Sequence, residues 1–206
     1  MKKKQLLYVH GGGSYSNYVA FLNHLRNAPI DDPLGERPLI WTNSLKEDLG
    51  DFFDVYTPTM PNKQNAKYEE WLIWFERYIT FLKPNSVLLG WSLGGYFLSK
   101  YLSENKFPTS IDSLYLLAAP FWSEDLGEED CADFSFDHEN LVKLEQQVLR
   151  IYIFHSKDDH IVSFSHAKKY KEYLKNAKLV EFSDRNHFIQ SDFPELISYL
   201  KEEINT

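Results

Sequence analysis

The feature that most constrains the fold is the pentapeptide Gly90-Trp91-Ser92-Leu93-Gly94, which has the form G-x-S-x-G. A serine in this pattern sits on a sharp turn between a strand and a helix, where larger residues two positions away would collide. The flanks fit that setting, because the apolar run 86–89 predicts a buried strand and the spacing of apolar residues in 95–102 predicts a helix. We therefore expect the Ser92 hydroxyl to project above the end of a strand, where a histidine can reach it.

Strand-type and helix-type segments alternate along the chain. Strands are predicted at 6–10, 51–56, 86–89, 113–119, 149–154 and 179–182, and helices at 17–27, 68–82, 95–102, 138–147, 165–174 and 193–203. This alternation predicts an α/β protein with a mostly parallel sheet and helices on both faces, in one domain spanning 1–206. The stretches 29–50 and 121–137 are expected to be irregular. In a parallel sheet ligands bind beyond the carboxyl ends of the strands, so the loops there are the ones that matter.

Composition excludes several classes of function. The net charge of −8 argues against nucleic acid and against an anionic membrane surface as partners, because both are bound through Lys and Arg. Cys131 is the only cysteine in the sequence, so no disulfide can form within the chain. The apolar run after the lysines at 2–4 is too short for a signal peptide, and no stretch approaches a membrane span. We expect a soluble cytoplasmic protein of unknown oligomeric state.

Three residue types needed for nucleophilic catalysis follow in a suitable order. A serine hydroxyl needs a base to take its proton, and the base needs an acid to orient it. With a G-x-S-x-G serine, the chain order is serine, then acid, then histidine. His187, between the last predicted strand and the last predicted helix, fits the base. Asp158 and Asp159 both follow the preceding strand, and position alone does not choose between them.

Two backbone amides are expected to bind the negative charge that develops on a substrate oxygen. One is that of Leu93, at the start of the helix after Ser92. The other belongs to the glycine-rich loop after the first strand, where the absence of side chains lets the backbone approach the oxygen closely. Gly12 is the preferred donor in this loop, and Gly13 is the alternative.

The same residues allow plainer interpretations. Ser92 can be a helix N-cap, His187 an ordinary loop histidine, and either aspartate a turn residue. The cluster at 155–160 contains metal-ligand types but matches no familiar zinc spacing, so we expect no metal. Ser16 stands where a dinucleotide-binding loop needs its third glycine, so we expect no cofactor. The remaining histidines are interpreted as structural or surface residues: His10, His24, His138 and His166. The acidic loop 121–137 is interpreted as solvated, and it would disfavour anionic substrates if it lined the site.

Several motifs together resemble a known family. They are the pentapeptide with the following Gly95, and the segments 60–62, 135–138, 156–162 and 184–188. With these motifs the chain resembles the small α/β-hydrolase-fold serine hydrolases of the retinoblastoma-binding-protein group and their compact bacterial relatives. The acid of such hydrolases typically lies in a D-x-x-V pattern, which Asp159 matches and Asp158 does not. The sequence departs from the family at Trp91, Ser163 and Asn186, none of which is a reacting group.

The resemblance implies a three-layer α/β-hydrolase fold without a large cap domain. It also implies hydrolysis of a small carboxylic ester, or of an amide or thioester, by Ser92, His187 and Asp159. A small open pocket is expected, with Trp91, Phe121 and Trp122 as candidate substrate-binding residues and Phe134 and Phe136 as further candidates. The segment 29–50 is expected to cover part of the site. The rival hypothesis is a non-catalytic interaction module on the same scaffold, although the L-x-C-x-E peptide of pocket-protein binding is absent.

Overall fold

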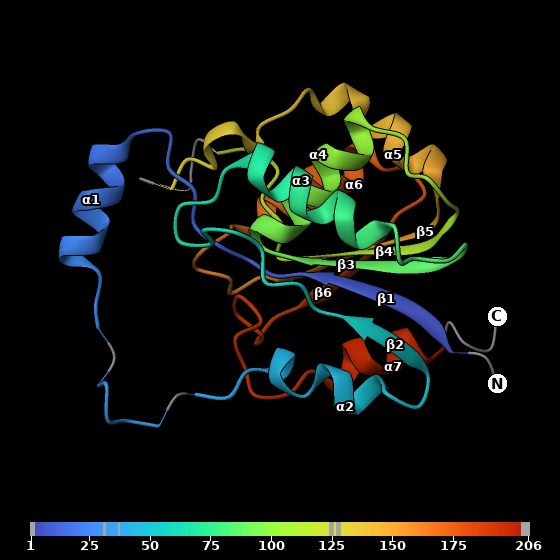
Figure 1. The fold of residues 1–206 in the computed structure, drawn as a ribbon, viewed down its shortest axis with the longest axis horizontal. Coiled ribbons are helices and arrows are strands. Elements are labelled where there is room, and N and C mark those ends of the chain that lie inside the picture. Colours follow the sequence, from blue (N-terminus) through green and yellow to red (C-terminus); the bar gives the residue numbers. More distant parts are fainter. Residues whose placement is uncertain (1–2, 31, 37, 124–125, 127–128, 203–206) are drawn as a thin grey trace.

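Six parallel strands form one sheet at the centre of the computed structural model, in the order β2-β1-β3-β4-β5-β6 (Figure 1). The structure describes residues 3–30, 32–36, 38–123, 126 and 129–202. The strands of the sheet are β1 (Lys4–Val9), β2 (Phe53–Tyr56), β3 (Ser86–Trp91), β4 (Ile111–Leu117), β5 (Val148–Ser156) and β6 (Lys178–Phe182). These strands overlap all six that the sequence predicts, with ends shifted by a few residues.

The register brings the carboxyl ends of five strands to one edge of the sheet. Val9 of β1 pairs with Gly90 of β3, and Trp91 pairs with Leu117 of β4. Leu117 in turn pairs with Phe154 of β5, and Ser156 of β5 pairs with Phe182 of β6. The loops that leave these strands therefore converge, and they carry the glycine-rich segment, Ser92 and the predicted acid and base.

Helices cover both faces of the sheet, each over its own apolar core (Figure 1). On one face lie α3 (Tyr68–Ile79), α4 (Leu93–Glu104), α5 (Leu141–Gln147) and α6 (Phe164–Tyr173). On the other lie α2 (Leu45–Leu49) and α7 (Pro194–Glu202). Short 3₁₀ turns occupy Trp41–Asn43, Ala132–Phe134 and His138–Asn140. The predicted three-layer arrangement is confirmed, and the described residues include no large cap domain.

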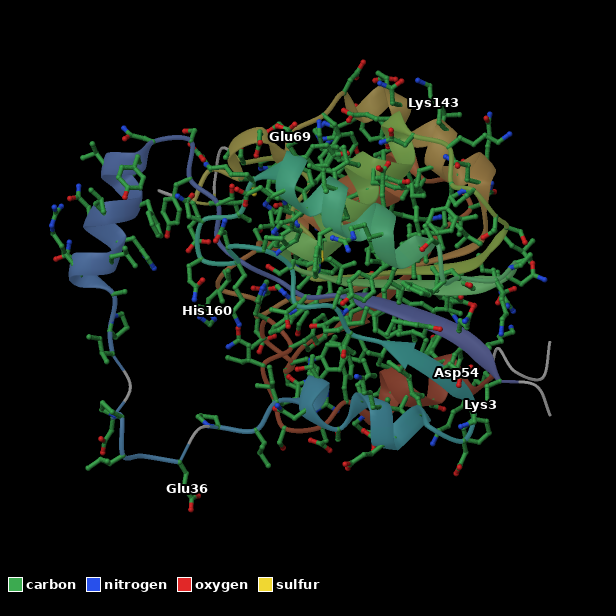
Figure 2. All side chains as sticks on the ribbon, viewed as in Figure 1. Lys3, Glu36, Asp54, Glu69, Lys143 and His160 are labelled. Carbon is green, nitrogen blue, oxygen red and sulfur yellow. The ribbon has the colours of Figure 1, made fainter. Side chains whose placement is uncertain are left out.

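Helix α1 (Tyr18–Asn27) projects from the body of the molecule and contacts it through Phe21 and His24, whose rings lie against Tyr15 (Figure 1). Asn17 caps it by accepting a hydrogen bond from the Val19 amide, and none of its residues is buried. Glu36 lies far from the sheet, whereas Trp41 is packed in the core (Figure 2). Several apolar side chains of α1 and the segment after it are open to solvent, and Leu34 is 96% exposed.

The expectation for 29–50 is wrong in its second half. Trp41, Leu45 and Leu49 are buried in the core beneath α2 and α7, on the sheet face opposite α4. The indole nitrogen of Trp41 donates to the Phe188 carbonyl at 2.9 Å, which anchors this segment. The prolines that suggest irregular chain all precede residue 41, and the apolar spacing 41, 45, 49 is helical. These residues pack on the sheet face opposite α4 and do not cover the site.

None of the helices among the described residues is both long enough and apolar enough to cross a membrane.

Candidate active site

Ser92 occupies a strained turn between β3 and α4. Its backbone lies at φ 54° and ψ −124°, a region that costs a residue with a side chain about 1–3 kcal/mol. The turn is tight because α4 passes close to the strands. A Cβ at Gly94 would lie 2.2 Å from the Val9 carbonyl oxygen, and one at Gly90 would lie 2.6 Å from the Gly95 Cα. The side chain of Ser92 caps no helix amide, so the plain N-cap interpretation does not hold.

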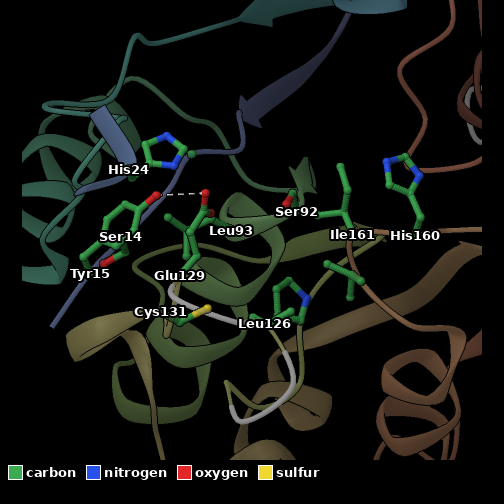
Figure 3. A pocket seen from close by; sticks show the side chains of 13 residues that line it. Ser14, Tyr15, His24, Ser92, Leu93, Leu126, Glu129, Cys131, His160 and Ile161 are labelled. Atoms are coloured by element: carbon green, nitrogen blue, oxygen red, sulfur yellow. Dashed lines mark hydrogen bonds between the residues drawn. The ribbon is translucent and has the colours of Figure 1, made fainter. Parts of the chain in front are cut away.

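The half-buried Ser92 opens onto a pocket of about 550 Å³ (Figure 3). One wall comes from the loop after β1, another from the loop after β4, and a third from the loop after β5. The residues that line it include Gly12, Tyr15, His24, Leu93, Leu126, Glu129, Cys131, His160, Ile161 and Val162. In Figure 3, Ser92 lies between Glu129 and Ile161. A substrate in this pocket would meet the serine hydroxyl.

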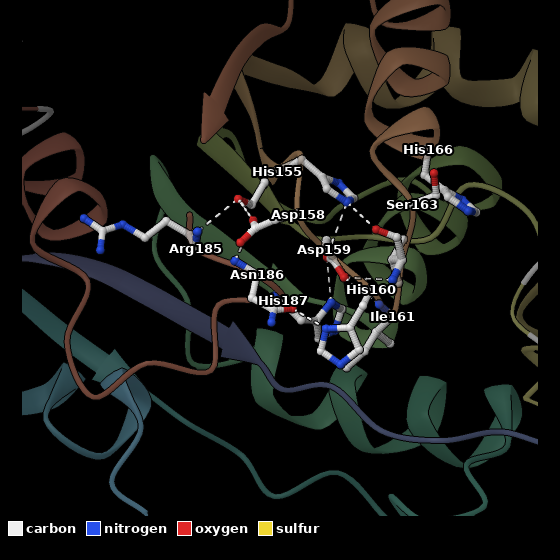
Figure 4. Close-up of polar contacts among 12 residues, drawn as sticks. His155, Asp158, Asp159, His160, Ile161, Ser163, His166, Arg185, Asn186 and His187 are labelled. Carbon is white, nitrogen blue, oxygen red and sulfur yellow. Dashed lines mark hydrogen bonds and ion pairs between the residues drawn. The ribbon is translucent and has the colours of Figure 1, made fainter. Parts of the chain in front are cut away.

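His187 and Asp159 form a buried hydrogen-bonded pair (Figure 4). The His187 Nδ1 lies 2.8 Å from the Asp159 Oδ2, and only 4% of His187 is exposed. A carboxylate accepts hydrogen bonds, so the proton of a neutral His187 is on Nδ1 and Nε2 is left as the acceptor. That is the tautomer that a general base needs. No hydrogen bond joins Ser92 Oγ to His187 among the described residues, and such contacts often tighten only when substrate is bound.

The Asp159 carboxylate is surrounded by donors. Its Oδ1 accepts from the amides of Ile161 and Val162, each at 2.9 Å. Burial by itself would raise the pKa of Asp159, but the hydrogen bonds from His155, His187 and the backbone outweigh it, so the pKa lies well below its usual range. The carboxylate is therefore charged at neutral pH and can stabilise a protonated His187.

Asp158 has a different role. Its side chain is exposed, and its Oδ1 accepts from the Asn186 amide at 2.9 Å and from the Ser156 hydroxyl. The Ser156 hydrogen bond, together with those from the backbone, lowers the pKa of Asp158. Asp158 thus ties the loop after β5 to the loop after β6, while Asp159 faces the histidine (Figure 4).

His155 supports the pair and was not singled out for this role from the sequence. It is 1% exposed, and its Nε2 lies 2.7 Å from the Val162 carbonyl oxygen and 3.4 Å from the Asp159 Oδ2. Its Nδ1 is buried without a partner among the described residues, so the ring proton is on Nε2. The only sequence signal is its place four residues before Asp159, on the strand that leads to the loop.

The glycine-rich loop presents one unpaired amide to the pocket. The Gly13 amide donates to the Lys63 carbonyl at 2.9 Å and is not available to a substrate. The amide of Gly12 has no acceptor within the described part of the chain, and Leu93 begins α4, where amides lack an intrahelical acceptor. Both residues line the pocket. The loop also runs against the serine, since a Cβ at Gly11 would lie 3.1 Å from the Ser92 Cβ.

The structure places the aromatic candidates outside the pocket, which corrects the expectation from the sequence. Trp91 donates from its indole nitrogen to the His187 carbonyl at 2.9 Å and packs in the core beneath the sheet. Phe121 is 3% exposed and stacks on His138, and Trp122 stacks on His166. These rings support the loops around the site. Phe134 and Phe136 likewise pack in or against the core over α4.

The histidines interpreted as structural divide into two groups. The His10 Nε2 accepts from the Met60 amide at 2.8 Å, and the His166 Nδ1 accepts from the Phe121 amide at 2.8 Å, so both hold loops. His24, by contrast, lies on α1 and lines the pocket. No group of three or more His, Cys, Asp or Glu side chains is arranged to hold a metal within the described ranges.

Comparisons with known proteins agree with this geometry. The serine hydrolase family matches residues 35–197. The ydeN gene product of Bacillus subtilis is 25% identical over 151 residues, which cover 71% of this chain and 76% of that protein. Its crystal structure gives a TM-score of 0.77 at 23% identity, covering 99% of this chain and 100% of that one.

More distant structures share the fold. A YdeN-like protein from Pectobacterium atrosepticum gives a TM-score of 0.64 at 14% identity, with coverage of 98% and 91%. The esterase domain of a Rhodothermus marinus protein gives 0.61 at 16%, with coverage of 97% and 83%. The expectation of a compact serine hydrolase is confirmed: the chain belongs to the serine hydrolase family and has the α/β-hydrolase fold.

Proposed function

We propose that this enzyme hydrolyses carboxylic esters of small molecules through Ser92, His187 and Asp159. The observation that carries the proposal is the buried His187–Asp159 hydrogen bond beside a serine that the β3–α4 turn directs into a pocket. The esterase-type relatives in the comparison are consistent with this choice. The mechanism needs no cofactor, and the reducing cytoplasm suits the single buried thiol of Cys131.

Acylation begins when His187 Nε2 takes the proton of the Ser92 hydroxyl as Oγ attacks the ester carbonyl carbon. The carbonyl oxygen becomes an oxyanion, which the amides of Gly12 and Leu93 bind. The intermediate then collapses, the bond to the alcohol oxygen breaks, and His187 returns its proton to that oxygen. Asp159 stabilises the imidazolium throughout these steps.

Deacylation repeats the sequence with water. His187 removes a proton from a water molecule, and the hydroxide oxygen attacks the acyl-enzyme carbonyl. Collapse of the second intermediate breaks the bond to Ser92 Oγ, which regains a proton from His187. The carboxylic acid leaves the pocket, and the enzyme is restored.

Covalent labelling by a fluorophosphonate tests this proposal, because the reagent reacts with activated serines. We expect the wild type to label, Ser92→Ala not to label, and His187→Ala to label far more slowly. Hydrolysis of a panel of short esters should follow the same order. A folded wild type that neither labels nor cleaves any ester would contradict the proposal and favour the interaction module, which a search for protein partners would then address.

A further inference from the structure

One carboxylate faces the pocket that contains Ser92. Glu129 is the only carboxylate among the described residues that line this pocket, and the other titratable side chains there are two histidines, a tyrosine and a thiol. Figure 3 shows its side chain between Tyr15 and Leu93. Glu129 is thus an exposed residue of the acidic loop that also borders the pocket.

A hydrogen bond holds this carboxylate and leaves one of its oxygens open. The Tyr15 hydroxyl donates to the Glu129 Oε1 at 3.1 Å, and Tyr15 itself is 1% exposed. The Lys67 ammonium fixes the Tyr15 backbone by donating to its carbonyl at 2.8 Å. The Glu129 Oε2 receives no hydrogen bond from any described residue. It lies 3.2 Å from the position that a Cβ on Gly13 would take, next to the loop that presents the Gly12 amide.

Two neighbouring aspartates of the acidic loop bind backbone amides. Asp130 accepts from the Ser16 amide at 2.9 Å, and Asp133 accepts from the Tyr68 amide at 3.0 Å. Both hold the acidic loop to other segments. Lys63 borders an adjacent depression together with Glu129, but the two form no ion pair. Among the described residues, no lysine or arginine forms an ion pair with the Glu129 carboxylate.

A second group in the pocket senses this negative charge. Burial, and then the charges of Glu129 and Asp130, raise the pKa of the Cys131 thiol to about 12. The thiol stays protonated and does not compete with Ser92 as a nucleophile. The same field that disfavours a thiolate favours a cation in this part of the pocket.

We infer that Glu129 forms a cation-binding subsite, and that the preferred substrates are esters with an ammonium group on the acyl or the alcohol side. The inference rests on the proposed esterase function and adds the class of substrate. The ammonium group would contact the Glu129 Oε2 while the ester carbonyl meets Ser92 and the amides of Gly12 and Leu93. Glu129 is then a specificity-determining residue that takes no part in the chemical steps.

Two isosteric pairs of substrates test the inference. For the alcohol side, acetylthiocholine is compared with 3,3-dimethylbutyl thioacetate, which replaces the ammonium nitrogen by carbon. For the acyl side, 4-nitrophenyl 4-(trimethylammonio)butyrate is compared with 4-nitrophenyl 5,5-dimethylhexanoate. In one of the pairs we expect the wild type to favour the cationic member by about five- to tenfold in kcat/KM, and less at high salt.

Two variants and a control identify the residue. Glu129→Gln should remove the preference, and Tyr15→Phe should reduce it by loosening the carboxylate. Glu76→Gln removes the same charge from an exposed position on α3, outside the pocket, and should keep the preference.

The outcomes separate the two proposals. Turnover of neutral esters without a cation preference in either pair, or a preference that survives in Glu129→Gln, would overturn the subsite while the hydrolase proposal stands. Absence of both turnover and fluorophosphonate labelling would contradict the hydrolase proposal, and the subsite with it.

Discussion

Replacing Asp159 by asparagine removes one negative charge from a position where four donors converge. The side-chain amide keeps the shape of the carboxylate but has one oxygen in place of two. If that oxygen faces the amides of Ile161 and Val162, the NH₂ group faces His187 Nδ1, which must then accept. His187 would carry its proton on Nε2 and could not take the proton of Ser92.

The alternative orientation restores the useful tautomer at a cost that can be worked out. The NH₂ group would then oppose the two backbone amides, each of which donates to the wild-type Oδ1 at 2.9 Å. Leaving a buried N–H donor without an acceptor costs roughly 1–3 kcal/mol, and this orientation leaves two of them. At about 1.4 kcal/mol per factor of ten, the active orientation becomes scarce enough to lower kcat by about 10²- to 10⁴-fold.

The assay compares Asp159→Asn with Asp158→Asn in ester hydrolysis and in fluorophosphonate labelling. Asp158 is the matched control, because it is the neighbouring aspartate, is exposed, and contacts Ser156 and Asn186 instead of His187. Its variant should keep kcat within about tenfold, since only the loop contact is weakened. A larger loss in Asp158→Asn than in Asp159→Asn would refute the reasoning.

The stability of Asp159→Asn should depend on pH in a defined direction. The folded protein lowers the pKa of Asp159, so its stabilising contribution is present above the unfolded pKa of about 3.9 and is lost as the pH falls further. We expect the free energy of unfolding of Asp159→Asn to be lower than that of the wild type by about 1–3 kcal/mol at pH 7. Urea unfolding should show this difference shrinking near pH 3, and a difference that grows in acid would contradict the assignment.

Three further predictions concern the serine turn, the histidine beside Asp159 and helix α1. Gly94→Ala should lower the free energy of unfolding by about 3 kcal/mol or more in urea unfolding, because its Cβ meets the Val9 carbonyl at 2.2 Å and backbone cannot move aside easily. His155→Leu should lower kcat and shift the acidic limb of the pH–kcat profile to higher pH, because the Asp159 carboxylate loses a donor and then stabilises protonated His187 more strongly. His155→Gln should restore part of the wild-type kcat and part of the wild-type profile. An unchanged profile in His155→Leu would mean that His155 has only a structural role. Double replacement of Val19 and Leu25 by serine should change the free energy of unfolding by no more than about 0.5 kcal/mol, since these side chains of α1 are 61% and 53% exposed. A large loss of stability would mean that these two side chains pack on the body of the protein.

The sheet and the serine turn could be predicted because both depend on local patterns. A buried parallel strand is a short apolar run, and the turn at Ser92 needs small residues at fixed positions, so both are visible in a few residues. The same applies to α1, for which Asn17 supplies a recognisable N-cap.

The orientation of a side chain in a loop depends on contacts that are distant in sequence. Strand position left Asp158 and Asp159 equal, and only the D-x-x-V resemblance favoured Asp159. The structure separates them because Val162 is buried, which draws the turn inward with Asp159 as the acceptor of its amides. Asp158 then faces the Asn186 loop. Nothing local encodes this difference.

The aromatic residues show the same limit. Trp91 and Phe121 follow strands at the edge where ligands bind, which made them reasonable pocket residues. Their burial is decided by partners from elsewhere, such as Trp41 and His138, whose positions depend on the whole fold. The pocket wall is instead formed by Tyr15 and the loop carrying Glu129, which come together through a hydrogen bond across 114 positions of sequence.

The backbone conformation of Ser92 sets the chemistry of this position against the stability of the fold. At a φ of 54°, glycine would occupy the turn more comfortably than serine, so the position that the chemistry needs is one where the resident side chain works against folding. Replacement of Ser92 by glycine should therefore relieve this backbone strain and raise the free energy of unfolding, at the expense of the hydroxyl.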